Sequence, residues 1–254
     1  MASKNAGLHK KRLLISAEGL SFFPRNGELH AKDGFISKEV IKKAKPGDVL
    51  TTNLSGKYIF LIPRFVDLMR RLRREPQIVL PKDIGAIIAA TGINSSSRVI
   101  DAGAGSGALS CFLANIVKEV VTYELREDFI AVVKENIEWL GLKNIKVKQG
   151  DIRKPIPEKG RDLMTLDIPE PWDALDTASS CLKVGGFLVS YVPGVPQMSQ
   201  FVDAARKRGD FMVLKSIELI EREWLVDGMR VRPSTHGISH TGFLTFCRKI
   251  KASA

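Results

Sequence analysis

The feature that constrains this chain most is a short stretch, RVIDAGAGSGAL at residues 98–109, in which an apolar strand leads into a glycine-rich turn. Val99 and Ile100 end the predicted strand, and Asp101 follows at its carboxyl end. The apolar run over residues 108–117 then predicts a helix. A strand, a glycine turn and a helix in this order are typical of an α/β sheet that binds a nucleotide-like ligand at its strand ends.

The spacing of the glycines separates the candidate ligands. Gly103, Gly105 and Gly107 form a GxGxG pattern, whereas a dinucleotide site needs G-x-G-x-x-G and here has Ala108 at the third glycine's place. A P-loop is excluded because no Gly-Lys-Ser/Thr follows. An acid before the turn, Asp101, instead suits the methionyl ammonium of S-adenosylmethionine (SAM). A purely structural glycine turn in another α/β fold is the alternative at this point.

Carboxylates also follow the next two predicted strands. The strand over residues 119–124 ends in Glu124, and the strand over residues 145–149 is followed by Asp151. An acid at the end of the second strand can accept hydrogen bonds from both ribose hydroxyls of an adenosine. An acid after the third can accept from the adenine amino group. The three acids together predict a SAM-dependent methyltransferase.

The rest of the chain fits one catalytic domain with a smaller one before it. Strands and helices alternate from residue 77 to 254, which predicts an α/β, Rossmann-like methyltransferase fold whose parallel sheet has an antiparallel edge, formed by residues 214–223 and 242–248. Residues 1–62 hold short strands between Asn-Gly, Asp-Gly, Pro-Gly and Ser-Gly turns, which predicts a small β-rich N-terminal domain. Residues 63–76 read as a basic helical linker.

Charge and cysteine content limit the partners and the compartment. The chain is formally +11, and residues 1–76 carry 16 Lys and Arg against 7 Asp and Glu. This asymmetry favours a polyanion-binding module, the alternative being a basic surface kept for solubility. The three widely spaced cysteines form neither a metal motif nor a disulfide framework, so no metal is expected. Without a signal peptide or a membrane-length apolar run, a cytoplasmic location is expected.

The loop after the fourth strand is the candidate catalytic segment. It reads DIPEPW, residues 167–172, and follows the predicted strand over residues 163–166. Such a loop faces the ligand from the carboxyl ends of the strands. Two prolines stiffen it and fix where Asp167 points. Asp167 can accept from the exocyclic amine of a base, and Trp172 offers an aromatic face; the alternative is a rigid helix entry with Trp172 in the core.

At these residues the chain resembles a known family, the TrmI tRNA (adenine-N1)-methyltransferases of archaea and bacteria. The resemblance covers nearly the whole chain. It is carried by QIVLPKDIG at 77–85, DAGAGSGAL at 101–109, DIPEPW at 167–172 and HTGFLTF at 240–246, with an N-terminal segment that begins KPGDV at 45–49.

The resemblance implies a substrate and a set of site residues. The substrate is the T-loop adenosine of tRNA at position 58, sometimes also 57, and similar enzymes are homotetramers. Asp167 lies between the methyl donor and the target base and is the implied catalytic residue. The implied SAM-binding residues are Val79, Gly103, Ala104, Gly105, Ser106, Gly107, Glu124, Asp151, Ile152 and Asp167.

The chemistry expected at Asp167 follows from the substrate. Adenine N1 carries an in-plane lone pair and needs no strong base, so the enzyme has to align it with the methyl group. Asp167 then stabilises the cationic product, and the base has to leave its stack. Leu80 departs from the family, which often has Tyr or His there.

Two other functions stay open from the sequence. One is a catalytically silent RNA-binding subunit on the same fold, and the other is a methyltransferase that acts on protein, such as one for isoaspartyl residues. His236 and His240 are expected to be structural. Arg230 and Arg232 are the better phosphate-binding candidates.

Overall fold

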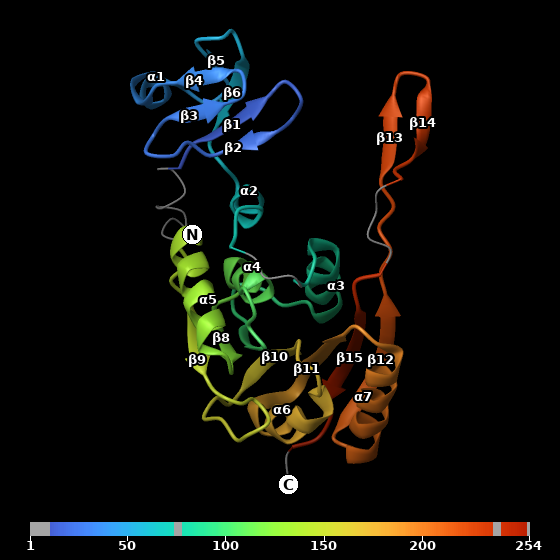
Figure 1. The fold of residues 1–254 in the computed structure, drawn as a ribbon. Coiled ribbons are helices and arrows are strands. Elements are labelled where there is room, and N and C mark those ends of the chain that lie inside the picture. The colour runs from blue at the N-terminus through green and yellow to red at the C-terminus, as the bar shows by residue number, and fades with distance from the viewer. Residues whose placement is uncertain (1–10, 74–77, 236–239, 253–254) are drawn as a thin grey trace. The chain divides into compact units, whose positions relative to one another are not determined.

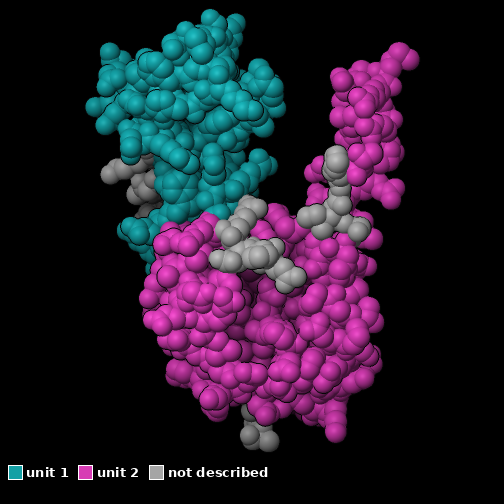
Figure 2. Space-filling model, viewed as in Figure 1, with its two compact units in different colours: residues 1–72, 138–143 teal, residues 73–137, 144–254 magenta. Residues whose placement is uncertain are grey.

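The computed structural model describes residues 11–73, 78–235 and 240–252. The chain forms two compact units, one of residues 1–72 with 138–143 and one of residues 73–137 with 144–254. Figure 2 shows the two units in separate colours. His236, Gln77 and the end of the expected basic linker lie outside the described residues.

The first unit is β-rich. A four-stranded antiparallel sheet has the order β2-β1-β6-β5, and β3 pairs with β4 in a separate hairpin. Its elements are β1 (Leu13–Ser16), β2 (Ser21–Phe22), β3 (Leu29–Ala31), β4 (Gly34–Ile36), α1 (Lys38–Lys43), β5 (Val49–Thr51), β6 (Lys57–Leu61) and α2 (Phe65–Met69). Its core consists of Leu14, Leu29, Ile36, Ile41, Leu50, Tyr58 and Phe60. The prediction of a small β-rich region at the N-terminus is confirmed.

The second unit is built on a seven-stranded sheet of order β12-β15-β11-β10-β7-β8-β9 (Figure 1). Neighbouring strands from β11 to β9 are parallel, and β15 runs antiparallel to both β11 and β12. The strands are β7 (Arg98–Ala102), β8 (Glu119–Glu124), β9 (Ile145–Gln149), β10 (Arg161–Leu166), β11 (Leu182–Val192), β12 (Phe211–Glu218) and β15 (Phe243–Lys249). The predicted α/β fold with an antiparallel edge is confirmed.

Helices cover both faces of this sheet. In Figure 1, α3, α4 and α5 lie on one side of it and α6 and α7 on the other. The helices are α3 (Pro81–Thr91), α4 (Ala108–Ile116), α5 (Glu127–Leu140), a 3-10 turn η2 (Pro171–Ala174), α6 (Leu175–Cys181) and α7 (Val195–Arg208). Ile100, Met164, Leu188 and Phe201 are buried in the core under α6 and α7. No helix among the described residues combines the length and apolar character needed to cross a bilayer.

The expected basic helix over residues 63–75 is much shorter in the structure. Helix α2 ends at Met69, and Arg73 does not continue it. The backbone N–H of Arg73 donates to Asn136 Oδ1 at 2.9 Å, and the Asn136 amide donates to the Arg73 carbonyl at 2.9 Å. A buried side chain therefore takes the backbone groups that a longer helix would have used.

A second hairpin, β13 (Trp224–Asp227) with β14 (Arg230–Pro233), was not expected from the sequence. Its exposed apolar side chains include Trp224, at 57% exposure, and Val226, at 72%. The periodicity of residues 214–223 suggested one strand that ends at 223, but β12 ends at Glu218. A two-stranded hairpin is only marginally stable on its own in water, so the exposed apolar side chains of β13 and β14 are available for further contacts.

Candidate active site

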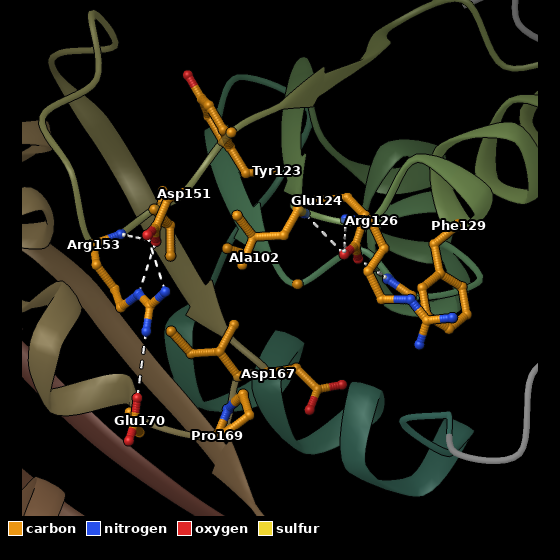
Figure 3. Close-up of a pocket in the computed structure, with 16 residues that line it drawn as sticks. Ala102, Tyr123, Glu124, Arg126, Phe129, Asp151, Arg153, Asp167, Pro169 and Glu170 are labelled. Carbon is orange, nitrogen blue, oxygen red and sulfur yellow. Dashed lines mark hydrogen bonds and ion pairs between the residues drawn. The ribbon is translucent and has the colours of Figure 1, made fainter.

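A cavity of about 640 Å³ opens at the carboxyl ends of β7, β8, β9 and β10 (Figure 3). All of its walls come from the second unit. It is lined by Ala102, Gly103, Gly105, Tyr123, Glu124, Leu125, Arg126, Phe129, Gly150, Asp151, Ile152, Arg153, Asp167, Ile168, Pro169 and Glu170. The carboxyl ends of parallel strands are where α/β sheets bind ligands.

Two glycines of the turn, Gly103 and Gly105, line this cavity, and the turn packs closely at Gly103 and Gly107. A Cβ on Gly103 would lie 3.3 Å from the Asp167 carbonyl and 3.6 Å from Glu124 Oε2. Gly107, the N-cap of α4, has φ +79° and would bring a Cβ within 3.0 Å of Val133. The turn thus lets the backbone of β7 come close to the ends of β8 and β10.

Glu124 ties this turn to the end of β8. Its Oε2 accepts a hydrogen bond from Gly105 N at 2.9 Å, and its Oε1 accepts from Leu125 N at 2.9 Å and Arg126 N at 3.0 Å. Two carboxylate oxygens offer about four acceptor positions. One position on Oε2 therefore remains, which is fewer than the two hydroxyl bonds that the sequence suggested.

Asp151 is engaged in a similar way at the end of β9. Arg153 donates to Asp151 Oδ1 from its backbone N at 3.0 Å and from Nε at 2.9 Å, and to Oδ2 from Nη2 at 3.0 Å. These bonds hold the pKa of Asp151 below its usual value. Arg153 also lies 3.3 Å from Glu170 (Figure 3), so it links the third and fourth strand ends across the cavity wall.

Asp167 follows β10, where its backbone joins two strands. Its N–H donates to the Ala102 carbonyl, and its carbonyl accepts from Gly103 N at 3.2 Å. The residue is exposed where its side chain opens into the cavity. Partial removal of the carboxyl group from solvent, together with the charges of Asp101 and Glu124, raises the pKa of Asp167 to about 7.

Asp101 lies beneath the turn and does not line the cavity. Its two oxygens accept from Thr122 Oγ1 and Thr165 Oγ1, each at 2.7 Å. Burial raises the pKa of Asp101 to about 6, while these two hydrogen bonds act in the opposite direction. Its charge therefore acts on the cavity only from below.

The structure gathers many of the sequence-predicted site residues at this cavity, but not all. Six of them line it: Gly103, Gly105, Glu124, Asp151, Ile152 and Asp167. Four others are not among its lining residues: Val79, Ala104, Ser106 and Gly107. Three of these four belong to the glycine turn itself, and the Ser106 hydroxyl is buried without a hydrogen-bond partner in the described part of the chain.

The remaining candidates, Trp172, His240, Arg230 and Arg232, do not line the cavity. Trp172 packs against the core of the second unit and does not line the cavity. His240 places its ring nitrogens 2.6 Å from Glu218 Oε1 and 2.8 Å from the Pro193 carbonyl, which raises its pKa. Arg230 and Arg232 lie on β14.

Two cavity residues, Arg126 and Phe129, and a buried asparagine that supports the glycine turn, Asn136, were not predicted from the sequence. Phe129 lies in the first turn of α5, and the Arg126 guanidinium lies 4.0 Å from the centre of its ring (Figure 3). Asn136 is buried and donates to the Ser106 carbonyl at 2.8 Å as well as to Arg73. The one available signal was an asparagine on the apolar face of a helix, close to Val133 in sequence.

The neighbouring charges of Asp101 and Glu124 and the raised pKa of Asp167 lead to one prediction. A carboxyl whose pKa is higher in the folded state than in the unfolded chain costs stability as pH rises between the two values. We expect Asp167→Asn to be more heat-stable than the unmodified protein at pH 8, with a gain that grows between about pH 4 and 7 and then stays constant. Melting curves across this range test it, with the exposed Asp173→Asn as control; a pH-independent difference would contradict it.

The sheet order, the glycine turn and the acids at its strand ends define a methyltransferase-type α/β domain, and comparison with solved structures agrees. A SAM-dependent O-methyltransferase from Thermotoga maritima superimposes with a TM-score of 0.88 at 27% identity, over 100% of this chain and 98% of that one. TrmI from Aquifex aeolicus superimposes with a TM-score of 0.82 at 24% identity, over 96% and 98%.

Sequence comparison narrows the class to a family. The model of the tRNA methyltransferase complex GCD14 subunit matches residues 57–232. The tRNA (adenine(57)-N(1)/adenine(58)-N(1))-methyltransferase TrmI of Methanocaldococcus jannaschii is 33% identical over 93% of this chain and 94% of its own length. TrmI of Thermus thermophilus, a tRNA (adenine(58)-N(1))-methyltransferase, is 32% identical over 95% and 97%. The chain belongs to this family of tRNA methyltransferases.

Proposed function

We propose that this protein transfers a methyl group from SAM to N1 of an adenine in the T-loop of tRNA, at position 58 and, as in the Methanocaldococcus relative, also at position 57. The names of the relatives support the substrate. The observation that carries the chemistry is the placement of Glu124, Asp151 and Asp167 at three strand ends around one cavity.

The residues present fit SAM. Gly103 leaves backbone-lined space where a Cβ would crowd the Asp167 carbonyl. Glu124 keeps one acceptor position for a ribose hydroxyl, and Asp151 keeps one for the adenine amine. Ile152 lines the wall beside Asp151 and is apolar, as suits the face of an adenine ring. Val79, Ala104, Ser106 and Gly107 would support this site from the turn and from the start of α3.

Asp167 is the proposed catalytic residue. SAM supplies the methyl group, and the N1 lone pair of the target adenine accepts it. As the ring becomes cationic, the Asp167 carboxylate accepts a hydrogen bond from the exocyclic amine and stabilises that charge. The backbone hydrogen bonds of Asp167 to Ala102 and Gly103 hold its main chain in place before the base arrives.

The direct test is methyl transfer from labelled SAM to an unmodified tRNA transcript, followed by nucleoside analysis. The proposal is supported if N1-methyladenosine forms and is no longer formed when the adenine at position 58 is replaced. A second product that depends on position 57 supports dual specificity. Methylation at another atom, or none while SAM binds, would refute it.

The alternatives from the sequence are less well supported. A silent RNA-binding subunit needs no cavity lined by three carboxylates, and a relative in Dictyostelium discoideum is named a catalytic subunit. A protein methyltransferase has no use for the basic first third. Calorimetric titration of SAM into the protein separates the two: the enzyme is expected to give a heat of binding and the silent subunit none.

The basic N-terminal third is the proposed tRNA-binding region. Because lysine and arginine release counterions when they neutralise phosphates, we expect tRNA affinity to fall by about tenfold or more between 50 and 200 mM salt. SAM affinity, set within the cavity, should change little over the same range. Filter binding and calorimetry measure the two; a flat salt response for tRNA would rule out this role.

We also propose that the protein works in the cytoplasm as a homotetramer. The exposed hairpin of β13 and β14 supports self-association, because Trp224, Leu225, Val226, Met229 and Val231 leave apolar surface uncovered. The three buried free cysteines of the protein suit a reducing compartment. Sedimentation gives the oligomeric state, and a monomer would refute the tetramer.

A further inference from the structure

Two segments that lie far apart in the sequence meet around one buried ammonium group. Lys82, in the first turn of α3, donates from Nζ to Asp83 Oδ1 at 2.9 Å, to the Leu219 carbonyl at 2.7 Å and to Thr241 Oγ1 at 2.6 Å. Thr241 Oγ1 in turn donates to Asp83 Oδ2 at 2.9 Å. We call Lys82, Asp83 and Thr241 the Lys82 cluster.

The charged groups of the cluster are buried, and their hydrogen bonds are made within the protein. The side chain of Lys82 is 10% exposed and that of Asp83 is 1% exposed. All three ammonium donors have acceptors, and both carboxylate oxygens of Asp83 are bonded. Removing one member would leave the polar groups of the others buried without a hydrogen-bond partner. The three side chains are therefore held in one relative geometry.

The Thr241 side of the cluster is fixed to the strand beside Asp167. Tyr191 Oη donates to the Thr241 carbonyl at 2.7 Å, and the Tyr191 ring lies against Gly242, where a Cβ would come within 2.6 Å of it. Tyr191 is on β11, and Ser190 is the register partner of Leu166 on β10. Tyr191 and Asp167 are therefore the next residues along two neighbouring strands.

The Lys82 side fixes the start of α3. Leu80 is the N-cap of this helix, and its carbonyl accepts from Asp83 N and Ile84 N, each at 3.0 Å. The cluster therefore sets where Leu80 lies relative to the end of β11. Leu80 has no polar atom in its side chain, so contact with a base at this position depends on shape alone.

We propose that Lys82, Asp83 and Thr241 are positioning residues for methyl transfer, which hold the start of α3 beside the Asp167 strand end so that the target base meets Asp167 in one orientation. This proposal rests on the proposed function. Apart from Val79, which precedes α3, and Asp167 itself, the proposed SAM contacts lie at the ends of β7, β8 and β9 and in the turn after β7. Loss of the cluster should therefore impair transfer without weakening SAM binding.

Thr241→Val tests this because it keeps the shape of the side chain and removes the hydroxyl. We expect kcat with tRNA to fall about tenfold or more at a temperature where the variant is fully folded, while the Kd for SAM stays within about twofold. Thr241→Ser, which keeps the hydroxyl, should restore most of kcat. Thr91→Val is the matched control, since among the described residues Thr91 Oγ1 bonds only to the Ile87 carbonyl, near the other end of α3.

Tyr191→Phe is a second test of the proposal, because it removes the hydroxyl group that bonds to the Thr241 carbonyl. We expect a smaller loss of kcat with the same unchanged SAM affinity. Full kcat for folded Thr241→Val, an equal loss in Thr91→Val, or a loss of SAM affinity in place of kcat would each overturn the proposal. If the unmodified protein forms no N1-methyladenosine, the proposed function itself fails, which the same assay shows.

Discussion

Replacing Asp167 by alanine is expected to lower kcat for methyl transfer about 10²- to 10³-fold, the cost of removing one preorganised group that stabilises transition-state charge. The main chain that carries this carboxylate is held at the end of β10 by hydrogen bonds to Ala102 and Gly103. The target amine would lose its acceptor as the ring becomes cationic. Single-turnover transfer to tRNA measures the effect apart from product release.

The affinity for SAM separates this role from a general disturbance of the cavity. Because Glu124 and Asp151 keep their own partners, we expect the Kd for SAM to rise less than about fivefold in Asp167→Ala. Asp173→Ala, an exposed carboxylate in η2 outside the cavity, is the control and should retain full activity. Unchanged transfer by Asp167→Ala would remove Asp167 from the mechanism.

The sheet could be predicted from the sequence because its information is local. Val99 with Ile100 in β7 and Val120 with Val121 in β8 are short apolar runs, and such runs are typical of buried parallel strands. The rule that ligands bind at the carboxyl ends of strands then brings Glu124, Asp151 and Asp167 together without any knowledge of side-chain packing.

What the sequence could not reveal depends on partners distant in the chain. Asn136 bonds to Arg73 and to the glycine turn, and it thereby takes the backbone groups of Arg73 that a longer helix would have used. Arg153 occupies three of the acceptor positions of Asp151, which no spacing rule indicates. The Lys82 cluster joins α3 to a segment that precedes the last strand. Such contacts arise from tertiary packing, which overrides local preference.

Replacing Glu124 by alanine is expected to raise the Kd for SAM about 100-fold, the loss that corresponds to about 3 kcal/mol for a hydrogen bond to a charged group. Two effects combine. The ribose loses its acceptor, and Gly105 N, which donates to Glu124 Oε2 at 2.9 Å, loses the partner that holds the glycine turn in place. Calorimetric titration of SAM into the variant measures the change.

Glu124→Gln tests the negative charge of Glu124 separately from the size of its side chain. If the glutamine oxygen replaces Oε1 and accepts from Leu125 N and Arg126 N, its NH₂ group faces Gly105 N, so that two donors oppose each other. We therefore expect the near-isosteric variant to bind SAM little better than Glu124→Ala. Glu127→Ala, at the exposed start of α5, is the control. A glutamine variant with unchanged affinity would show that the negative charge at the end of β8 does not contribute to binding.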